Sequence, residues 1–258
     1  MGVLLAWRNE SFENHVMGML ELWNIKFSRA YTPTLSRVLD LNPREVNLLV
    51  KKAVILHDAG KLYRGYQEAL RDGRSGIRAE YRHELVSAYY AHGWILGHRM
   101  SEVDYCLTSA IALHHEPILM GQVGRIREPY LTITEVLRRF NKVSQEGVLD
   151  MIDEGVSFLE GLLKTHVGLE VRLPRRVPVN RGESEEKSLA RILRDILLMA
   201  SVKGSGQHKA KLRLKTASLL SVLCVLDSWV ANRARGMDDD GGTFITRYAG
   251  LAEVPLAW

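Results

Sequence analysis

Cysteine, proline and aromatic residues are all scarce in this chain. Its 258 residues include two cysteines and seven prolines, and 7% of them are aromatic. Cys106 and Cys224 stand apart in apolar stretches, so we expect neither a disulfide framework nor a cysteine zinc site. The sequence has no G-x-x-x-x-G-K-[ST] motif, which excludes a P-loop motor. Strand-like alternation is also rare, which argues against a parallel sheet with a phosphate loop.

Long apolar runs are missing too. No segment approaches the roughly 18 apolar residues of a membrane span, and the apolar stretch near the N-terminus is too short for a signal peptide. We therefore expect a cytoplasmic protein without a membrane partner. Hydrophobic residues make up 46% of the chain and charged residues 25%, which is ordinary for a globular protein. The net charge of +5 permits an anionic partner without proving one.

Helical periodicity extends over nearly the whole sequence. One helix is expected to open at Asn42-Pro43 and to end at His57-Asp58-Ala59-Gly60, with Gly60 as its C-terminal stop. Ser11 and Ser101 are the expected N-caps of two others. Further helices are predicted over about residues 12–29, 83–98, 101–114, 132–140, 145–166, 184–202 and 209–235.

The remaining segments are predicted to be loops. Residues 71–82 are rich in Gly and Arg, and residues 167–182 form an extended segment with a short hairpin near 168–180. The predicted fold is therefore all-α, with a single domain over residues 1–258, a core at about 12–235 and a C-terminal tail at 236–258.

Nine histidines occur, several of them at predicted helix ends. Side chains from separate helices can converge at such ends. His57-Asp58 and His114-His115 each close an apolar helix, and His83 opens another. Each is ordinary by itself, since a capping or surface histidine is the more common case. Together they suggest a metal site, because imidazole and carboxylate groups suit a divalent transition metal or Mn²⁺.

Asp227 is the least expected polar residue of the sequence. It lies inside the apolar stretch Leu219–Ala231, where an unpaired buried carboxylate carries a penalty of several kcal/mol. It therefore needs a cation, a hydrogen-bond network or a place on a polar face. A core arginine or the end of a neighbouring helix would satisfy it as well as a metal ion would. His15, near the start of the first helix, would by itself be an ordinary surface histidine.

The order of these candidate residues along the chain resembles that of the HD superfamily of metal-dependent phosphohydrolases: His15, His57-Asp58, His83, His114-His115 and then Asp227. Lys61 completes the H-D-x-G-K form of that family. Tyr66-Gln67 is similar to the aromatic-Gln pair of CRISPR-associated HD nucleases, although Tyr replaces the more usual Phe, and Arg82-His83-Glu84 matches their next histidine motif. The chain thus resembles the stand-alone HD nuclease subunit of type I CRISPR interference over about residues 15–235. In such systems the helicase is a separate chain, which agrees with the missing P-loop.

The resemblance implies a single HD-type domain with two metal ions. One ion would be held by His15, His57, Asp58 and Asp227; Asp58 would bridge to a second ion held by His83, His114 and His115. Asp58 and Lys61 would be the catalytic residues, with Lys61 near the scissile phosphate. Mixed ligands of this kind favour Mn²⁺, Ni²⁺ or Co²⁺, with Mg²⁺ also compatible. The implied activity is degradation of single-stranded DNA in antiviral defence, together with a separate helicase and an RNA-guided effector complex.

Basic and polar residues near these motifs are candidates for nucleic-acid contacts. They are Gln67, Arg74, Arg78 and Arg82 beside the metal motifs, and Lys209, Lys211 and Arg213 in the densest basic run. A solvated surface explains such charge runs equally well.

Two other functions fit the same motifs. A nucleotide phosphohydrolase or cyclic-nucleotide phosphodiesterase would keep the metal chemistry but need a small closed pocket instead of an open basic groove. A non-catalytic helical subunit could use metal ions only to stabilise its fold. The second is disfavoured, because Lys61 and a bridging Asp58 have no obvious structural purpose.

Overall fold

A computed structural model describes residues 3–7, 10–73, 81–95, 101–115, 133–179, 189 and 206–234. Of the sequence predictions, Arg74, Arg78, nearly all of the helix expected at 184–202 and the tail at 236–258 lie outside these described residues.

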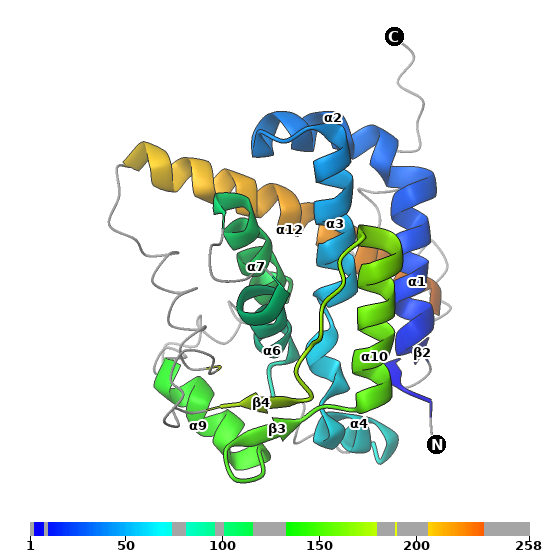
Figure 1. The fold of residues 1–258 in the computed structure, drawn as a ribbon, viewed down its shortest axis with the longest axis vertical. Coiled ribbons are helices and arrows are strands. Elements are labelled where there is room, and N and C mark those ends of the chain that lie inside the picture. The colour runs from blue at the N-terminus through cyan, green and yellow to red at the C-terminus, as the bar shows by residue number, and fades with distance from the viewer. Residues whose placement is uncertain are drawn as a thin grey trace.

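Helices dominate the described part of the chain, as the all-α prediction required (Figure 1). The α-helices are α1 (Phe12–Leu22), α2 (Ser28–Leu39), α3 (Pro43–Leu56), α4 (Arg64–Arg71), α6 (His83–Tyr89), α7 (Glu102–Leu113), α9 (Ile133–Val143), α10 (Asp153–Leu162) and α12 (Gly206–Ala234). A 3-10 turn covers Ala59–Leu62, and π-helical turns cover Trp23–Phe27, Tyr90–Ile95 and Leu163–Val167.

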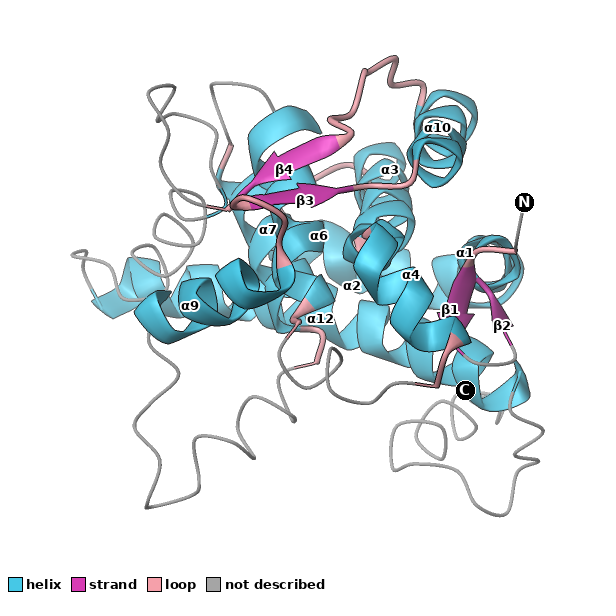
Figure 2. Cartoon of the chain, turned by 90° about the horizontal axis from the view of Figure 1, so that it is seen from below, coloured by secondary structure: helices cyan, strands magenta, loops and turns pink. Residues whose placement is uncertain are grey.

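Two antiparallel strand pairs complete the described structure. β1 (Leu5–Trp7) pairs with β2 (Glu10–Ser11), and β3 (Val148–Asp150) pairs with β4 (Arg176–Pro178). The two pairs lie far apart, with β1 and β2 beside α1 and α4 (Figure 2).

The predicted N-caps are confirmed. The Ser11 side chain accepts a hydrogen bond from the Asn14 backbone N–H. Asn42 and Ser101 each form a reciprocal capping box with the acid three residues later. These bonds satisfy backbone donors that would otherwise be lost at a helix start.

The predicted bounds of several segments are wrong. The helix expected at 145–166 begins only at Asp153. Glu146 and Gly147 both adopt positive φ values, of 52° and 74°, and turn the chain into β3. The extended segment expected near 168–180 is present, but β4 pairs with β3 and not with a neighbouring part of its own segment.

The first helix also differs from its prediction of 12–29. It continues through the π-helical turn into α2, which ends at Leu39 and is followed by Asp40 in the left-handed conformation (φ 61°). Gly60 does not end the helix before it: α3 ends at Leu56, and Gly60 lies in the 3-10 turn without a positive φ.

Helix α12 bears on the expectation that no segment approaches a membrane span. Residues Ala210–Ala234 are long and apolar enough by length and composition, with a mean hydropathy of 1.5 in an 18-residue window. The core helix of a folded domain can have the same composition. This helix packs against α1, α2, α3 and α7, so we interpret it as a core helix.

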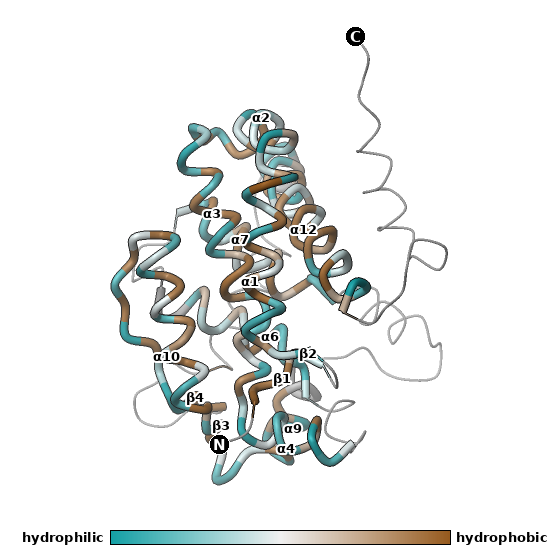
Figure 3. Tube along the Cα trace, turned by 90° about the vertical axis from the view of Figure 1, so that its right-hand side faces the viewer, coloured by the Kyte–Doolittle hydropathy of each residue, from teal (hydrophilic) through white to brown (hydrophobic). Residues whose placement is uncertain are grey.

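The core lies where α1, α3, α7 and α12 come together, and hydrophobic segments follow these helices in Figure 3. One cluster of buried side chains extends from Phe12 to Leu226, with Trp23 and Tyr89 among its largest fully buried members. This packing holds the ends of α3, α6 and α7 at fixed positions.

Candidate metal centre

Three helix ends meet at Asp58. His57 and Asp58 leave the C-terminus of α3, His83 opens α6, and His114 is the C-cap of α7. His57, Asp58 and His114 are at most 4% exposed, and His83 is 9% exposed. The convergence expected from helix ends is therefore found among these residues.

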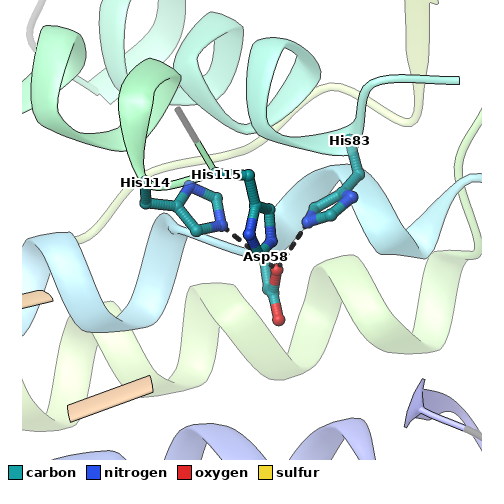
Figure 4. A group of neighbouring side chains, drawn as sticks. All are labelled: Asp58, His83, His114 and His115. Carbon is teal, nitrogen blue, oxygen red and sulfur yellow. Dashed lines mark ion pairs between the residues drawn. The ribbon is translucent and has the colours of Figure 1, made fainter. Parts of the chain in front are cut away.

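The first ligand group consists of Asp58, His83, His114 and His115 (Figure 4). One donor atom from each lies within 4.8 Å of all the others. His83 Nε2 is 3.1 Å and His114 Nε2 is 3.8 Å from the same Asp58 oxygen, Oδ1. The His115 ring lies beside both other imidazoles, 4.9 Å from His83 and 4.1 Å from His114 between ring centroids.

The second group consists of His15, His57 and Asp58, again within 4.8 Å. Here the other carboxylate oxygen takes part, because Asp58 Oδ2 lies 3.3 Å from His57 Nε2 and 3.7 Å from His15 Nε2. Asp227 joins from α12, with its Oδ1 3.2 Å from His15 Nε2. Asp58 thus belongs to both groups and turns one oxygen toward each.

The donor set fits divalent metal ions. Asp58 Oδ1, His83 Nε2 and His114 Nε2 are buried and have no hydrogen-bond partner among the described residues. Leaving a buried polar atom unsatisfied costs about 1–3 kcal/mol. Three such atoms facing one another are best explained by a cation between them, and mixed nitrogen and oxygen donors suit Mn²⁺, Ni²⁺ or Co²⁺.

The imidazole rings are oriented by their Nδ1 atoms. His57 Nδ1 donates to the Val54 carbonyl at 2.8 Å, and His114 Nδ1 donates to the Ile111 carbonyl at 2.6 Å. A carbonyl can only accept, so the hydrogen is on Nδ1 in both rings. The Nε2 atoms are therefore left to face Asp58, where a metal ion would take the place of any Nε2 proton.

The charges within the centre are strongly coupled. Burial would raise the pKa of Asp58, but His57 and Lys61 outweigh it and keep the pKa well below the usual value. Lys61 Nζ lies 2.6 Å from Asp58 Oδ2; burial would lower the Lys61 pKa, but Asp58 raises it overall, so the amine stays protonated. Burial and the neighbouring His114 and His83 lower the pKa of His115 to about 2, which leaves that ring neutral.

At His15 and Asp227, burial and hydrogen bonds also shift the pKa in opposite directions. Burial would lower the pKa of His15, but hydrogen bonds with Asp227 and Glu10 raise it to about 9. Burial would raise the pKa of Asp227, but the hydrogen bond with His15 lowers it. With no metal bound, these two side chains therefore form a charged pair.

Gly60 joins the Asp58 turn to the start of α6. Its N–H donates to Ser87 Oγ at 2.9 Å, and Ser87 Oγ in turn donates to the His83 carbonyl at 2.9 Å. The Tyr81 hydroxyl donates to the Gly60 carbonyl at 2.7 Å. A Cβ at this position would lie 2.1 Å from the His83 carbonyl oxygen. The glycine is required by close backbone approach, not by a helix stop.

Two of the expected nucleic-acid contacts are buried side chains. Gln67 is fully buried and bonds to the backbone of Leu5 and Lys61. Arg82 is 6% exposed and pairs with Glu84. Sequence motifs reveal residue type but not burial, and both residues are enclosed by the chain's own packing.

The remaining candidate contacts lie elsewhere. Lys211 and Arg213 are exposed near the start of α12, and the side chain of Lys209 lies outside the described part. Sixteen helical residues separate Lys211 from Asp227, a rise of roughly 24 Å. They can therefore touch a nucleic acid only at a distance from the metal centre.

Sequence reasoning missed Glu10. The Glu10 Oε1 atom lies 2.8 Å from His15 Nδ1, and Glu10 is 7% exposed. Nothing in the sequence distinguishes this acid from its exposed neighbours, because its position depends on the pairing of β1 with β2.

The fold and the centre together define an all-α domain in which histidines and aspartates from separate helices can hold metal ions. A family model described as "Cas3, HD domain" matches residues 16–233, starting one residue after His15. The chain therefore belongs to the Cas3 HD domain family. Membership confirms the resemblance seen in the sequence, and with it a metal-dependent nuclease of the hydrolase class.

The chain is similar to several proteins named CRISPR-associated endonuclease Cas3-HD. The protein of Pyrococcus furiosus is 30% identical over 241 residues, covering 90% of this chain and 92% of the relative. That of Methanocaldococcus jannaschii is 28% identical over 231 residues, covering 87% and 86%. A solved structure of a CRISPR-associated Cas3 HD domain protein from Methanocaldococcus jannaschii aligns with a TM-score of 0.59 and 26% identity, over 86% of this chain and 100% of the other.

Proposed function

We propose that this chain is an endonuclease that hydrolyses single-stranded DNA at a centre holding two divalent metal ions. The observation that carries the proposal is the position of Asp58, whose two oxygens face two different groups of histidines. Such a carboxylate suits a bridge between two ions.

The two ions would share the ligands as follows. His15, His57, Asp58 and Asp227 would hold one, and Asp58, His83, His114 and His115 the other, with Mn²⁺, Ni²⁺ or Co²⁺ as the best-suited metals. Bound metal ions in such a pair lower the pKa of water and neutralise charge on the attacked phosphate.

The protein's own groups prepare this centre. Lys61 stays protonated beside Asp58, where it fixes the bridging carboxylate and offers positive charge to a phosphate. The neutral His115 presents a lone pair without first losing a proton. The backbone carbonyls of Val54 and Ile111 hold two of the imidazoles in the required tautomer.

The relatives' names favour a nucleic acid over a mononucleotide as the substrate. We further propose that the nuclease acts in the cytoplasm as a single HD-type domain, together with a separate helicase and an RNA-guided CRISPR effector. Lys211 and Arg213 remain proposed contacts for the strand away from the centre.

Circular single-stranded DNA tests the proposal, because a circle has no ends for an exonuclease. The purified chain is incubated with the circle, and separately with nucleotides and cyclic nucleotides, in Mn²⁺, Ni²⁺, Co²⁺ or Mg²⁺. Asp58→Ala is the test variant, and Asp153→Ala, an exposed acid at the start of α10, is the matched control.

We expect linearisation and further degradation of the circle by the wild type and the control, and none by Asp58→Ala. Hydrolysis of nucleotides alone would overturn the nuclease proposal in favour of a nucleotide phosphohydrolase or cyclic-nucleotide phosphodiesterase. A folded, metal-loaded protein that cleaves nothing would indicate a non-catalytic helical subunit.

A further inference from the structure

Glu10 and His15 form a buried pair at the edge of the metal centre. Glu10 Oε1 lies 2.8 Å from His15 Nδ1, and the two residues are 7% and 1% exposed. The opposite ring nitrogen, Nε2, faces Asp227, His57 and Asp58 at 3.2, 3.4 and 3.7 Å. Glu10 therefore fixes the Nδ1 edge of the ring, and the Nε2 edge points into the centre.

The partner of His15 differs in kind from those of two other candidate ligands. His57 and His114 donate Nδ1–H to backbone carbonyls three residues earlier, which any helix C-terminus can supply. His15 lies in the first turn of α1 and has a side-chain carboxylate instead. A carboxylate acceptor both fixes the tautomer and makes the imidazole a stronger ligand.

Glu10 is itself held by the N-terminal strand pair. Glu10 pairs with Trp7 between β2 and β1. The Gln67 side chain accepts from the Leu5 N–H at 2.9 Å and donates to the Leu5 carbonyl at 2.8 Å. The same Gln67 amide donates to the Lys61 carbonyl at 2.8 Å. A continuous set of bonds thus connects Glu10 to the turn that carries Asp58.

We propose that Glu10 is a positioning residue, which orients His15 for the metal ion shared with His57, Asp58 and Asp227. The inference rests on the proposed two-metal function. Removing such a partner typically weakens metal affinity about 10–100-fold. Glu10 bonds to His15 and is not a member of the group of Asp58, His83, His114 and His115, so an ion held by that group should bind with nearly wild-type affinity.

A purely structural salt bridge is the competing explanation, and it predicts a different result. It would lower the stability of the fold in Glu10→Ala without changing the metal concentration needed for half-maximal binding. The test therefore measures metal binding directly, and not only cleavage.

Three variants are compared by calorimetric titration with Mn²⁺. Glu10→Ala removes the acceptor, and Glu10→Gln keeps an oxygen of the same size but removes the charge. Glu21→Gln, an exposed acid farther along α1, is the control for loss of a negative charge. We expect one of the two ions to bind about 10–100-fold more weakly in Glu10→Ala, less so in Glu10→Gln, and unchanged in the control. Cleavage at saturating Mn²⁺ should recover to within about a factor of three, so the effect appears in half-saturation and not in maximal rate.

Asp58→Ala in the same titration separates the two proposals. Suppose that Asp58→Ala loses metal, while Glu10→Ala and Glu10→Gln fold and both bind two ions with wild-type affinity. In that case only the inference on Glu10 is overturned, and the proposed function stands. If Asp58→Ala binds two ions and cleaves DNA as the wild type does, the proposed function itself fails. Should Glu10→Ala not fold, the near-isosteric Glu10→Gln decides: an unchanged half-saturation in that variant also overturns the inference.

Discussion

Replacing Gly60 by alanine should damage the metal centre without touching a ligand. The new Cβ would lie 2.1 Å from the His83 carbonyl oxygen and 2.9 Å from its Cα. Both are backbone atoms, so no side-chain rotation can relieve the clash. An ordinary contact is about 3.5 Å, so the Asp58 turn and the start of α6 must separate by about 1.4 Å.

That displacement exceeds what metal ligation tolerates. Ligand distances normally vary by about 0.2 Å, and Asp58 and His83 lie on the two segments that would move apart. We expect Gly60→Ala to lose one ion and nearly all nuclease activity. Overpacking of this kind also costs about 1–3 kcal/mol in the free energy of unfolding.

Gly161→Ala is the matched control, because a Cβ on Gly161 in α10 meets nothing within 4 Å. In a helix this change should stabilise the fold by about 0.5–1 kcal/mol and leave cleavage unchanged. Urea unfolding and Mn²⁺ titration measure both effects. Wild-type metal binding and cleavage in Gly60→Ala would refute the reasoning.

Three further predictions follow from named contacts. Gln67→Ala leaves the partly buried backbone groups of Leu5 and the buried carbonyl of Lys61 without this partner and should lower the free energy of unfolding by about 2–4 kcal/mol in urea; a loss below about 0.5 kcal/mol would contradict it. Glu160 bonds Arg175, which lowers the Glu160 pKa; Glu160→Gln should therefore cost about 1 kcal/mol at pH 7. Because the folded-state pKa is depressed, this difference should vanish as the pH falls through it, and a difference that stays constant throughout the acid titration would argue against the pair. The His15 pKa of about 9 means that a metal ion displaces a proton there; the apparent Mn²⁺ affinity should rise up to about tenfold per pH unit from pH 6 to 8, and calorimetry in two buffers that finds no proton release would exclude this competition.

The sequence was informative where helices begin and end. Ser11, Asn42 and Ser101 cap helices because each has a short polar side chain directly before an apolar run. Such a side chain can accept a hydrogen bond from a backbone N–H of the first helical turn. The candidate ligands His57 and His114 follow the last turns of α3 and α7 for a similarly local reason. Their convergence around Asp58 could be expected from the order of the motifs, but not from any single motif.

Contacts that depend on distant chain segments could not be predicted in this way. The pairing of β3 with β4 joins residues near 149 to residues near 177, and periodicity carries no information on such partners. Gln67 and Arg82 are buried by segments far along the chain or by their own neighbours, so their polar character suggested exposure wrongly. Glu10 became visible only when the strand pair placed it against His15.

Anomalous diffraction from crystals grown with Mn²⁺ tests the central claim most directly. The account predicts two peaks about 3.5–4 Å apart, one on each side of the Asp58 carboxylate. The first should lie among His15, His57 and Asp227, and the second beside His83 and His114. A single peak, or two peaks that do not share Asp58, would contradict the two-metal centre.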